Sequence, residues 1–342
     1  MESKNVVITG VLGQIGSYAA DLYVEKGYNV IGIERRSANP YKENIQQLER
    51  NPLFRMEEAD ICDFASMSGI AKKYTPYLWL NFAAQSHVAT SFKQPIYTTE
   101  VDYIGVLNQL EAIRLFSPET RFWQASTSER YGNGTDKPQN EETPVNPASP
   151  YAVAKISAEM AIKCYAKSYG LYATYGIMFN SESPRRSKAF VTRKITDYVA
   201  QLITASDETG FSPDFLIRMG EPKLLLGNIE ARRSWTHAKD TVRGIDLQMQ
   251  LDKPDVFVFG REESHSIKDL LNIAFGNYNL NYEDFVGISS EFYRPNDVVY
   301  LQPDCTKAKT ILGWEPKIPL YALVDEMLTK DIERWRQHVC LH

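Results

Sequence analysis

A glycine-rich turn between a predicted strand and a predicted helix constrains the fold of this chain more than any other feature. Residues 5–9, NVVIT, form a short β-branched run typical of a buried strand. Gly10, Gly13 and Gly16 follow directly and lead into a helical-period segment over 14–26. Glycines there permit a tight turn, close approach of the backbone to a pyrophosphate and close packing of helix on strand. The spacing is G-x-x-G-x-x-G, not the commoner G-x-G-x-x-G, but the strand–turn–helix context favours a nucleotide-binding turn over a purely structural one.

Strand-like and helix-like segments alternate through the first half of the chain. Such alternation predicts a parallel sheet with helices on both faces and ligands at the carboxyl ends of its strands. The expected fold class is therefore α/β, a Rossmann-type doubly wound parallel sheet. The predicted strands are 5–9, 29–33, 54–60, 78–84, 121–126 and 172–179, and the predicted helices are 14–26, a segment opening near Asp63, 96–116 and 149–169.

The rhythm changes after Asn180, where the segments become irregular and prolines separate them. We expect residues 1–180 to form a nucleotide-binding domain that carries the catalytic residues. Residues 181–342 are expected to form mainly a smaller, mixed C-terminal substrate-binding domain that closes over the sheet edge. Within it, the segment near 234–262 is expected to return to the first domain.

Charge and composition exclude several classes of protein. The net charge is −5, so nothing calls for a nucleic acid or an anionic membrane as partner, and an anionic ligand needs a local cluster of donors. The cysteines are scattered without a CxxC pair, which indicates reduced thiols and no metal site. The N-terminus lacks an apolar signal segment and no run is long enough to span a membrane, so we expect a cytoplasmic protein.

The end of the second predicted strand, GIERRSAN, bears on the choice of cofactor. A carboxylate at this place bonds the ribose 2′-hydroxyl of NAD, whereas arginines accommodate the 2′-phosphate of NADP. Both types are present, because Glu34 is followed by Arg35 and Arg36. The two arginines offer a bidentate phosphate grip, although either one alone is also consistent with a solvated charged loop. We predict NADP, and NAD stays open because of Glu34.

Other residues of the first half are expected to contact the same cofactor, because they follow the glycine turn or the ends of predicted strands. Asp60 and Ile61 are placed to touch the adenine, and Ala83 and Ala84 leave room for the cofactor backbone. The full predicted set is Gly10, Gly13, Gln14, Ile15, Gly16, Arg35, Arg36, Asp60, Ile61, Ala83 and Ala84, together with Tyr151 and Lys155.

A second constellation combines hydroxyls, a carboxylate and a tyrosine–lysine pair. The fifth predicted strand ends in STSE, with Thr127, Ser128 and Glu129, and SPYAVAK places Tyr151 and Lys155 on one face of a helix. An ammonium beside a phenol favours the phenolate, so we expect a lowered pKa of Tyr151 and proton transfer near neutral pH. Tyr-x-x-x-Lys is common by chance, but its combination with the glycine turn and the hydroxyls makes chance improbable.

These motifs together resemble those of the extended short-chain dehydrogenase/reductases. A narrower set, spread in order over nearly the whole chain, resembles the GDP-mannose 4,6-dehydratase family. The motifs of this set are NFAAQSHV, QASTSERYG, SPYAVAK, FNSESPRR, FVTRKI, LGN and RPNDV. The resemblance implies a lyase with tightly bound NADP that converts GDP-mannose to GDP-4-keto-6-deoxymannose.

The resemblance also implies a role for each member of the second constellation. Thr127 would hold the sugar 4-hydroxyl, and Tyr151 would be the base during oxidation at C4. Lys155 would tune Tyr151 and bond the nicotinamide ribose. Glu129 would remove the C5 proton, which is acidic beside the new C4 ketone, before water leaves C6 and hydride returns to C6. Ser128 would support this pocket.

The implied partner is a GDP-sugar, and the implied assembly is a homodimer or homotetramer. Arg185 and Arg186 are ambiguous, since they also fit a brace for the cofactor loop, and His87 fits either the pocket or a structural role. Asp297 stands where the family usually has a glutamate. By resemblance, the residues that would hold the sugar nucleotide are Ser86, Ser128, Asn180, Lys194, Arg233, Arg294 and Asp297, with both of these arginines in loop-like segments.

The chain also departs from the family pattern. Ile15 replaces the usual aspartate of the glycine turn, and Ser234 and Thr236 alter the expected RDWGHAKD. Segment 205–228 is longer than its counterpart and charged, and the loop after Arg36 is short. The reaction type is therefore better supported than the identity of the sugar or the number of subunits.

Three alternatives stay open. The first is a 4,6-dehydratase of another GDP-sugar, such as a GDP-heptose or GDP-N-acetylglucosamine. The second is a nucleotide-sugar epimerase, which would use Thr127 and Tyr151 but has no required use for Glu129. The third is a non-catalytic, NADP-sensing module, which should have lost Tyr151 or Lys155, and both remain.

Overall fold

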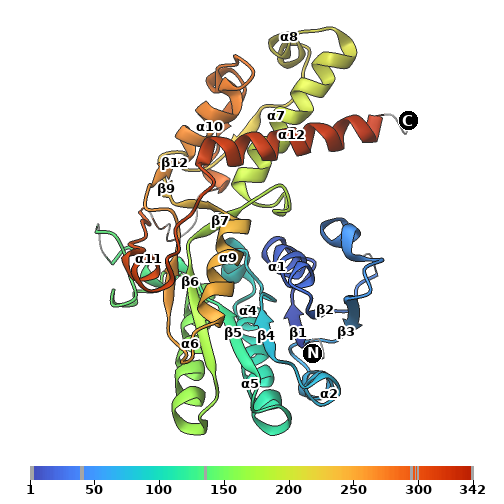
Figure 1. Ribbon diagram of the computed structural model, residues 1–342. Coiled ribbons are helices and arrows are strands. Elements are labelled where there is room, and N and C mark those ends of the chain that lie inside the picture. Colours follow the sequence, from blue (N-terminus) through green and yellow to red (C-terminus); the bar gives the residue numbers. More distant parts are fainter. Residues whose placement is uncertain are drawn as a thin grey trace.

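A seven-stranded parallel sheet forms the centre of the molecule in the computed structural model, which describes residues 4–38, 42–134, 137–292, 296, 298 and 300–339 (Figure 1). The strand order is β11-β6-β5-β4-β1-β2-β3, so the direction of winding reverses between β1 and β4, where such sheets bind ligands. The strands are β1 (Asn5–Thr9), β2 (Asn29–Glu34), β3 (Phe54–Glu58), β4 (Leu78–Asn81), β5 (Arg121–Ala125), β6 (Ala173–Met178) and β11 (Phe257–Phe259). The predicted Rossmann-type doubly wound sheet is confirmed.

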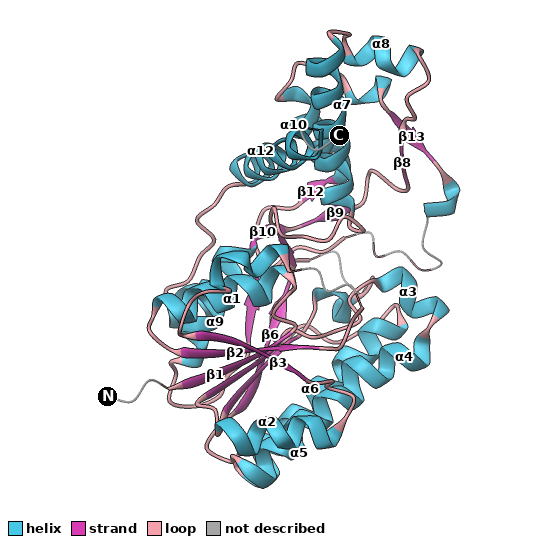
Figure 2. Ribbon diagram, turned by 90° about the vertical axis from the view of Figure 1, so that its right-hand side faces the viewer, coloured by secondary structure: helices cyan, strands magenta, loops and turns pink. Residues whose placement is uncertain are grey.

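Helices cover both faces of this sheet (Figure 2). One face carries α1 (Gln14–Glu25) and α9 (Ala238–Met249), and the other carries α2 (Phe64–Tyr74), α5 (Gly105–Phe116) and α6 (Pro150–Tyr169). Because both faces are covered, β1, β4, β5 and β6 are buried along most of their length, and Trp79 and Trp123 are completely buried. The indole of Trp123 donates to Gln248 Oε1 of α9 at 2.8 Å, which satisfies its buried N–H.

The helix expected over 96–116 is interrupted. It consists of α4 (Pro95–Thr99), a π-helical turn η2 (Glu100–Ile104) and α5, and a short helix α3 (Val88–Lys93) precedes it. Single π-turns inside α-helices often lie at functional sites. This one turns Asp102 inward, where its side chain is fully buried.

We predicted irregular segments after Asn180, and this prediction is wrong in one respect, because the second half contains two long helices. These are α7 (Val191–Thr209) and α12 (Leu320–Val339), and α10 (Ile267–Gly276) packs with both. Their apolar residues form a second hydrophobic cluster, which includes Val199, Phe275 and Val324. Among the described residues of this half, the prolines fall between the helices or at their starts, so they separate long helices and do not break them.

Short elements connect the sheet to this helical part. β7 (Asn180–Glu182) pairs in parallel with β10 (Trp235–His237), β9 (Arg232–Arg233) pairs antiparallel with β12 (His265–Ser266), and β8 (Leu224–Leu226) pairs in parallel with β13 (Val286–Ile288). The other described elements are η1 (Glu43–Leu48), η3 (Ser128–Tyr131), α8 (Pro213–Arg218), η4 (Tyr282–Asp284), η5 (Ser290–Phe292) and α11 (Thr306–Leu312).

Side chains of α12 also reach back to the sheet part. Glu326 Oε2 lies 2.9 Å from Nε2 of the buried His237, whose Nδ1 accepts a hydrogen bond from the Lys239 amide and caps α9. Arg334 Nε donates to Glu43 Oε1 at 2.6 Å. These contacts hold α12 against α9 and η1. Within the described residues, no helix is long and apolar enough to span a membrane.

Candidate active site

A cavity of about 870 Å³ lies at the carboxyl ends of the central strands, between the sheet and the helical part. The glycine turn, the loop after β4, the STSE segment and α6 line it from the sheet side. The segment after β6, the start of α7 and the region from β8 to β9 line it from the helical side. The cavity therefore brings together segments that lie far apart in the sequence, as expected for a ligand site at a topological switch point.

The glycine turn has no room for side chains. Gly10 has a φ of +68°, and a Cβ there would lie 2.6 Å from the Ala83 amide nitrogen. A Cβ on Gly16 would collide with the Gly10 carbonyl oxygen, so α1 starts very close to the end of β1. No side chain caps the start of α1 and its first turn is not acidic, which suits a pyrophosphate.

The loop after β4 explains the close approach at Gly10. The fourth strand ends at Asn81, earlier than expected, so Ala83 and Ala84 belong to the loop above the glycine turn. Ala84 lines the cavity, as do Gly13, Gln14 and Ile15. The Gln14 side chain bridges to the segment after β6, where it donates to the Ser181 carbonyl at 2.5 Å and accepts from Ser183 Oγ at 2.7 Å.

The remaining predicted cofactor residues lie outside this cavity, at the ends of β2 and β3. Arg35 and Arg36 are exposed, and Arg35 Nη1 donates to the Tyr97 hydroxyl at 2.8 Å. Asp60 accepts a hydrogen bond from the Cys62 amide at 2.9 Å. Ile61 is buried and packs against Gly105 at the start of α5.

The STSE segment and the tyrosine–lysine pair meet in the cavity. Thr127 N-caps η3, because its Oγ1 accepts from the Glu129 amide at 3.1 Å. Ser149 caps α6, so Tyr151 and Lys155 lie one turn apart near its start. Lys155 Nζ lies 5.8 Å from the centre of the Tyr151 ring and donates to the Ala125 carbonyl at 3.1 Å. Ser128 completes this part of the lining.

The pKa of Tyr151 is raised, so the expected lowering is wrong. Burial is the main cause, and the Asp102 carboxylate raises this pKa further. A hydrogen bond with Thr127 opposes the increase. Burial also lowers the pKa of Lys155. Because both groups are almost completely buried, the cost of removing charge from water outweighs the attraction between phenolate and ammonium.

A buried ion pair beneath the STSE segment was not predicted from the sequence. Arg130 Nη1 lies 3.0 Å from Glu159 Oε2, and Ser126 Oγ donates to the other oxygen of Glu159. Glu159 is one turn beyond Lys155 on α6. The pair therefore ties both ends of the Thr127–Ser128–Glu129 turn to the helix that carries Tyr151 and Lys155.

The helical side of the cavity carries cations, as predicted. Lys194 lies in the first turn of α7, with its ammonium 5.2 Å from the centre of the Phe292 ring. Arg233 is buried and lies in the short strand β9, not in the expected loop. Asn180 begins β7, and Ser86 follows β4. Each of these side chains lines the cavity. The predicted residues Arg294 and Asp297 lie outside the described part of the chain.

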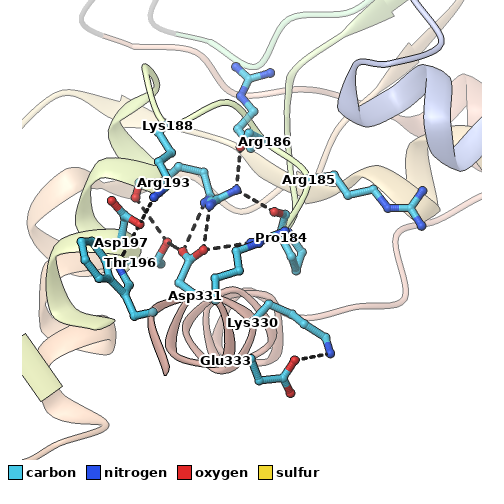
Figure 3. A network of polar contacts seen from close by, with 12 residues as sticks. Pro184, Arg185, Arg186, Lys188, Arg193, Thr196, Asp197, Lys330, Asp331 and Glu333 are labelled. Carbon is cyan, nitrogen blue, oxygen red and sulfur yellow. Dashed lines mark hydrogen bonds and ion pairs between the residues drawn. The ribbon is translucent and has the colours of Figure 1, made fainter. Parts of the chain in front are cut away.

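The contacts of His87, Arg185 and Arg186 show where each of these side chains lies. His87 lines the cavity, with its Nδ1 2.8 Å from Thr90 Oγ1. Arg186 lines the cavity too and stacks on Phe190, with its guanidinium carbon 3.5 Å from the ring centre. Arg185 points away from the Arg193–Asp331 pair (Figure 3), and its Nη1 pairs with Asp21 of α1 at 2.7 Å. Arg185 thus braces the glycine-turn helix.

Sequence reasoning also missed Glu182, which lines the cavity although it is almost completely buried. Its Oε2 accepts from Thr192 Oγ1 at 2.6 Å and lies 3.4 Å from Arg186 Nε. Burial raises the pKa of Glu182, and the charge of Arg186 opposes this increase. FNSESPRR carries the signal, because an acidic residue directly after a buried strand points into a site or needs a buried partner.

Arg193 of α7 holds the loop over residues 183–190 in place (Figure 3). Arg193 Nη1 donates to the carbonyls of Pro184 and Arg186, both at 2.6 Å. Its other nitrogens bond the Asp331 carboxylate, with Nη2 to Oδ1 at 2.7 Å. Arg193 and Asp331 are both buried, so this pair sets the position of the loop that carries Arg186 into the cavity.

Solved structures with the same fold define the class of protein. The chain superposes on the UDP-glucose 4-epimerase of Thermotoga maritima with UDP-glucose at a TM-score of 0.81 and 28% identity, covering 97% of this chain and 99% of that one. The dTDP-glucose 4,6-dehydratase of Bacillus anthracis str. Ames in complex with NAD gives a TM-score of 0.82 at 20% identity, covering 98% of both chains. The fold is that of the extended short-chain dehydrogenase/reductases.

Sequence comparison narrows the class to one family. The family profile described as GDP-mannose 4,6 dehydratase matches residues 7–327. GDP-mannose 4,6 dehydratase 1 of Arabidopsis thaliana is 40% identical over 96% of this chain and 90% of its own length. GDP-mannose 4,6 dehydratase of Homo sapiens is 38% identical over 97% of this chain and 93% of its own length. The chain belongs to the GDP-mannose 4,6-dehydratase family, and the predicted family is confirmed.

Proposed function

We propose that this protein is a GDP-mannose 4,6-dehydratase that uses tightly bound NADP and forms GDP-4-keto-6-deoxymannose. One observation carries the proposal: Glu129 lines the same cavity as Thr127, Tyr151 and Lys155. An oxidoreductase or an epimerase needs the last three groups, whereas dehydration also needs a base for the C5 proton. The curated relatives that match most of the chain carry the name of this activity.

The cofactor is proposed to lie along the glycine turn, where close backbone contacts leave no room for side chains at Gly10 and Gly16, so that a pyrophosphate could approach the main chain closely. Gly10, Gly13 and Gly16 would hold the pyrophosphate, with Gln14, Ile15, Ala83 and Ala84 beside it and Asp60 and Ile61 toward the adenine. A bound nicotinamide would supply the redox chemistry of the reaction, which is the temporary storage of one hydride. Arg35 and Arg36 favour NADP over NAD. Tighter binding of NAD than of NADP in calorimetry contradicts this choice.

Tyr151 is proposed to move the proton of the sugar 4-hydroxyl. Thr127 lies in the same cavity and lowers the pKa of Tyr151, so it would orient the same hydroxyl. Lys155 keeps a positive charge beside the phenolate as it forms, and its ammonium also binds the nicotinamide ribose. Burial favours the protonated phenol, so Tyr151 must enter this step as the phenolate, which takes the 4-hydroxyl proton as hydride leaves C4. The proton taken up here balances the one that C5 regains when hydride returns to C6.

Glu129 is proposed to carry the elimination. Its carboxylate removes the C5 proton, which is acidic because the neighbouring C4 is now a ketone, and then gives a proton to the C6 hydroxyl as water leaves. The Glu129 amide is fixed by Thr127 Oγ1 at 3.1 Å, so acid–base chemistry and sugar orientation share one rigid turn. Ser128 supports this turn.

The sugar nucleotide is proposed to be held mainly from the helical side. Lys194 and Arg233 would bind the diphosphate, because these half-buried and buried cations line the cavity and could make charge-assisted hydrogen bonds to phosphate oxygens. Asn180 and Ser86 would bond the sugar or its phosphates, and Arg294 and Asp297 would lie near the nucleoside. In this arrangement residues 1–180 with the segment near 234–262 form the cofactor domain, and the rest of 181–342 forms mainly the substrate domain.

The proposal extends to assembly and location. We infer a homodimer or homotetramer in the cytoplasm. The described cysteines, Cys62, Cys164 and Cys305, form no disulfide, which fits a reducing compartment. Size-exclusion chromatography with light scattering tests the assembly, and a monomer contradicts it.

A panel of sugar nucleotides tests the activity. The purified protein is incubated separately with GDP-, UDP-, CDP- and dTDP-sugars, and each product is weighed by mass spectrometry. The proposal expects loss of one water from GDP-mannose. Loss of water from a different GDP-sugar instead would support the reaction type and show that the proposed substrate is wrong. Isomerisation without loss of water identifies an epimerase, and no reaction with bound NADP identifies a sensing module.

A further inference from the structure

The ammonium of Lys155 is buried, and its hydrogen bond to a neutral carbonyl does not balance a positive charge there. The side chain is 3% exposed, and among the described residues its hydrogen-bond partner is the neutral Ala125 carbonyl. An isolated buried ammonium is costly and tends to lose its proton. A carboxylate close to Lys155 is therefore needed to keep it charged.

Two buried carboxylates act on Lys155, Asp102 and Glu159, and Asp102 has the larger effect on its pKa. Glu159 is already engaged, because it pairs with Arg130 at 3.0 Å and accepts a hydrogen bond from Ser126. Asp102 is different. Its Oδ1 accepts from the Gln85 amide at 2.7 Å, but among the described residues its Oδ2 has no hydrogen-bond partner, although the side chain is 0% exposed.

The position of Asp102 follows from the π-turn. Helix α6, which carries Tyr151 and Lys155, packs against η2, and Asp102 is the most deeply buried residue of that turn. Its bond to Gln85 fixes the carboxylate beside the loop that also provides Ala84 and Ser86 to the cavity. A buried carboxylate with one oxygen unpartnered is rare unless it has a function.

We propose that Asp102 is the counter-ion of Lys155, a positioning residue that keeps the buried ammonium protonated and in place beside Tyr151. The effects that Asp102 and Lys155 have on each other's pKa agree with this assignment. Burial raises the pKa of Asp102 to about 6, and Lys155 opposes the increase. Asp102 in turn raises the pKa of Lys155 and of Tyr151. The other charged or titratable groups that act on this trio are Glu129, Glu159 and Arg186.

The first test needs no substrate, so it stays valid if the proposed dehydratase activity on which this role rests is absent. Carbon NMR of protein labelled at the aspartate carboxyl carbons follows the titration of Asp102, with the signal assigned by its loss in Asp102→Asn. The proposal expects Lys155→Met to raise the pKa of Asp102 by about one unit. Lys163→Met removes the same charge from an exposed position on α6 and is expected to leave that pKa unchanged. An unchanged pKa in Lys155→Met overturns the proposal.

The second test uses the pH profile of turnover. Asp102→Asn should lower the pKa of both Tyr151 and Lys155, so both limbs of the profile of kcat should move to lower pH by about one unit. Glu100→Gln removes a charge from an exposed position of the same π-turn and should leave both limbs in place. A loss of kcat that is equal at every pH, with no shift of the limbs, indicates a merely structural role and overturns the proposal.

Discussion

Two buried ion networks in this molecule are built in opposite ways. In the helical part, both oxygens of Asp331 are bonded, Oδ1 by Arg193 and Arg334 and Oδ2 by Thr196 and Arg193 (Figure 3). In the sheet part, one oxygen of Asp102 has no hydrogen-bond partner among the residues that the structure describes. A fully bonded network fixes one arrangement of the chain, whereas a partly bonded one keeps charges whose protons can move. Substitutions in the sheet part should therefore affect mainly the reaction rate, and substitutions in the helical part should affect mainly stability and substrate binding.

The largest expected effect comes from the sheet part. Glu129→Gln should lower the rate of dehydration roughly 10²- to 10⁴-fold, because a general acid–base is removed. Oxidation at C4 should persist, so mass spectrometry of the enzyme-bound nucleotide should find a keto sugar that retains its C6 hydroxyl. Glu142→Gln, an exposed neighbour in the chain, serves as the control and should behave like the wild type. Normal turnover in Glu129→Gln would show that another group removes the C5 proton.

The next effect comes from the helical part and appears in stability. Asp331→Asn leaves Arg193 buried without its charge partner, so the free energy of unfolding should fall by about 3–5 kcal/mol. Urea denaturation followed by circular dichroism measures this loss. Glu333→Gln breaks the exposed pair with Lys330 on the same helix and should cost less than about 1 kcal/mol. If the two variants are equally stable, the buried Arg193–Asp331 pair does not stabilise the helical part more than an exposed pair does.

Substrate binding should respond to the cations of the helical side. Arg233→Gln is expected to raise KM for the sugar nucleotide roughly 10- to 100-fold with little change in kcat, because a charge-assisted phosphate contact is lost from ground state and transition state alike. Arg232→Gln, the exposed neighbour in β9, should leave KM unchanged. A loss confined to kcat would instead place Arg233 in the chemistry.

The smallest expected effect concerns the contact between α12 and α9 at low pH. A hydrogen bond with His237 is the main cause that lowers the pKa of Glu326 to about 2. A lowered carboxyl pKa stabilises the fold above the unfolded-state value, about 4.3, and this contribution is lost as the pH falls toward 2. Glu326→Gln should therefore flatten the decline of stability over this range, measured as Tm against pH. An unchanged slope contradicts the assignment.

The same contrast explains what the sequence revealed. The sheet, the glycine turn and the tyrosine–lysine pair were predictable, because local periodicity and short motifs specify them. The cavity then gathers Thr127, Glu129, Tyr151 and Lys155 as the motifs suggested. Such motifs carry information about elements that are close in the sequence.

The rest depends on long-range packing. Asp102 was not predicted, because nothing in VDYIG reveals that a π-turn buries it where α6 packs. The pairing of Arg193 with Asp331 joins residues far apart in the chain, and Arg130 with Glu159 becomes visible only when α6 is placed against β5. The raised pKa of Tyr151 was missed for the same reason, since a motif does not report burial.

Following the C4 hydrogen tests the central claim most directly. GDP-mannose that carries deuterium at C4 is converted by the NADP-bound protein, and the product is analysed by mass spectrometry and NMR. If Glu129 and Tyr151 act as proposed, the product lacks one water and carries the deuterium at C6. A product that keeps its water, or that has lost the deuterium from C6, contradicts this account.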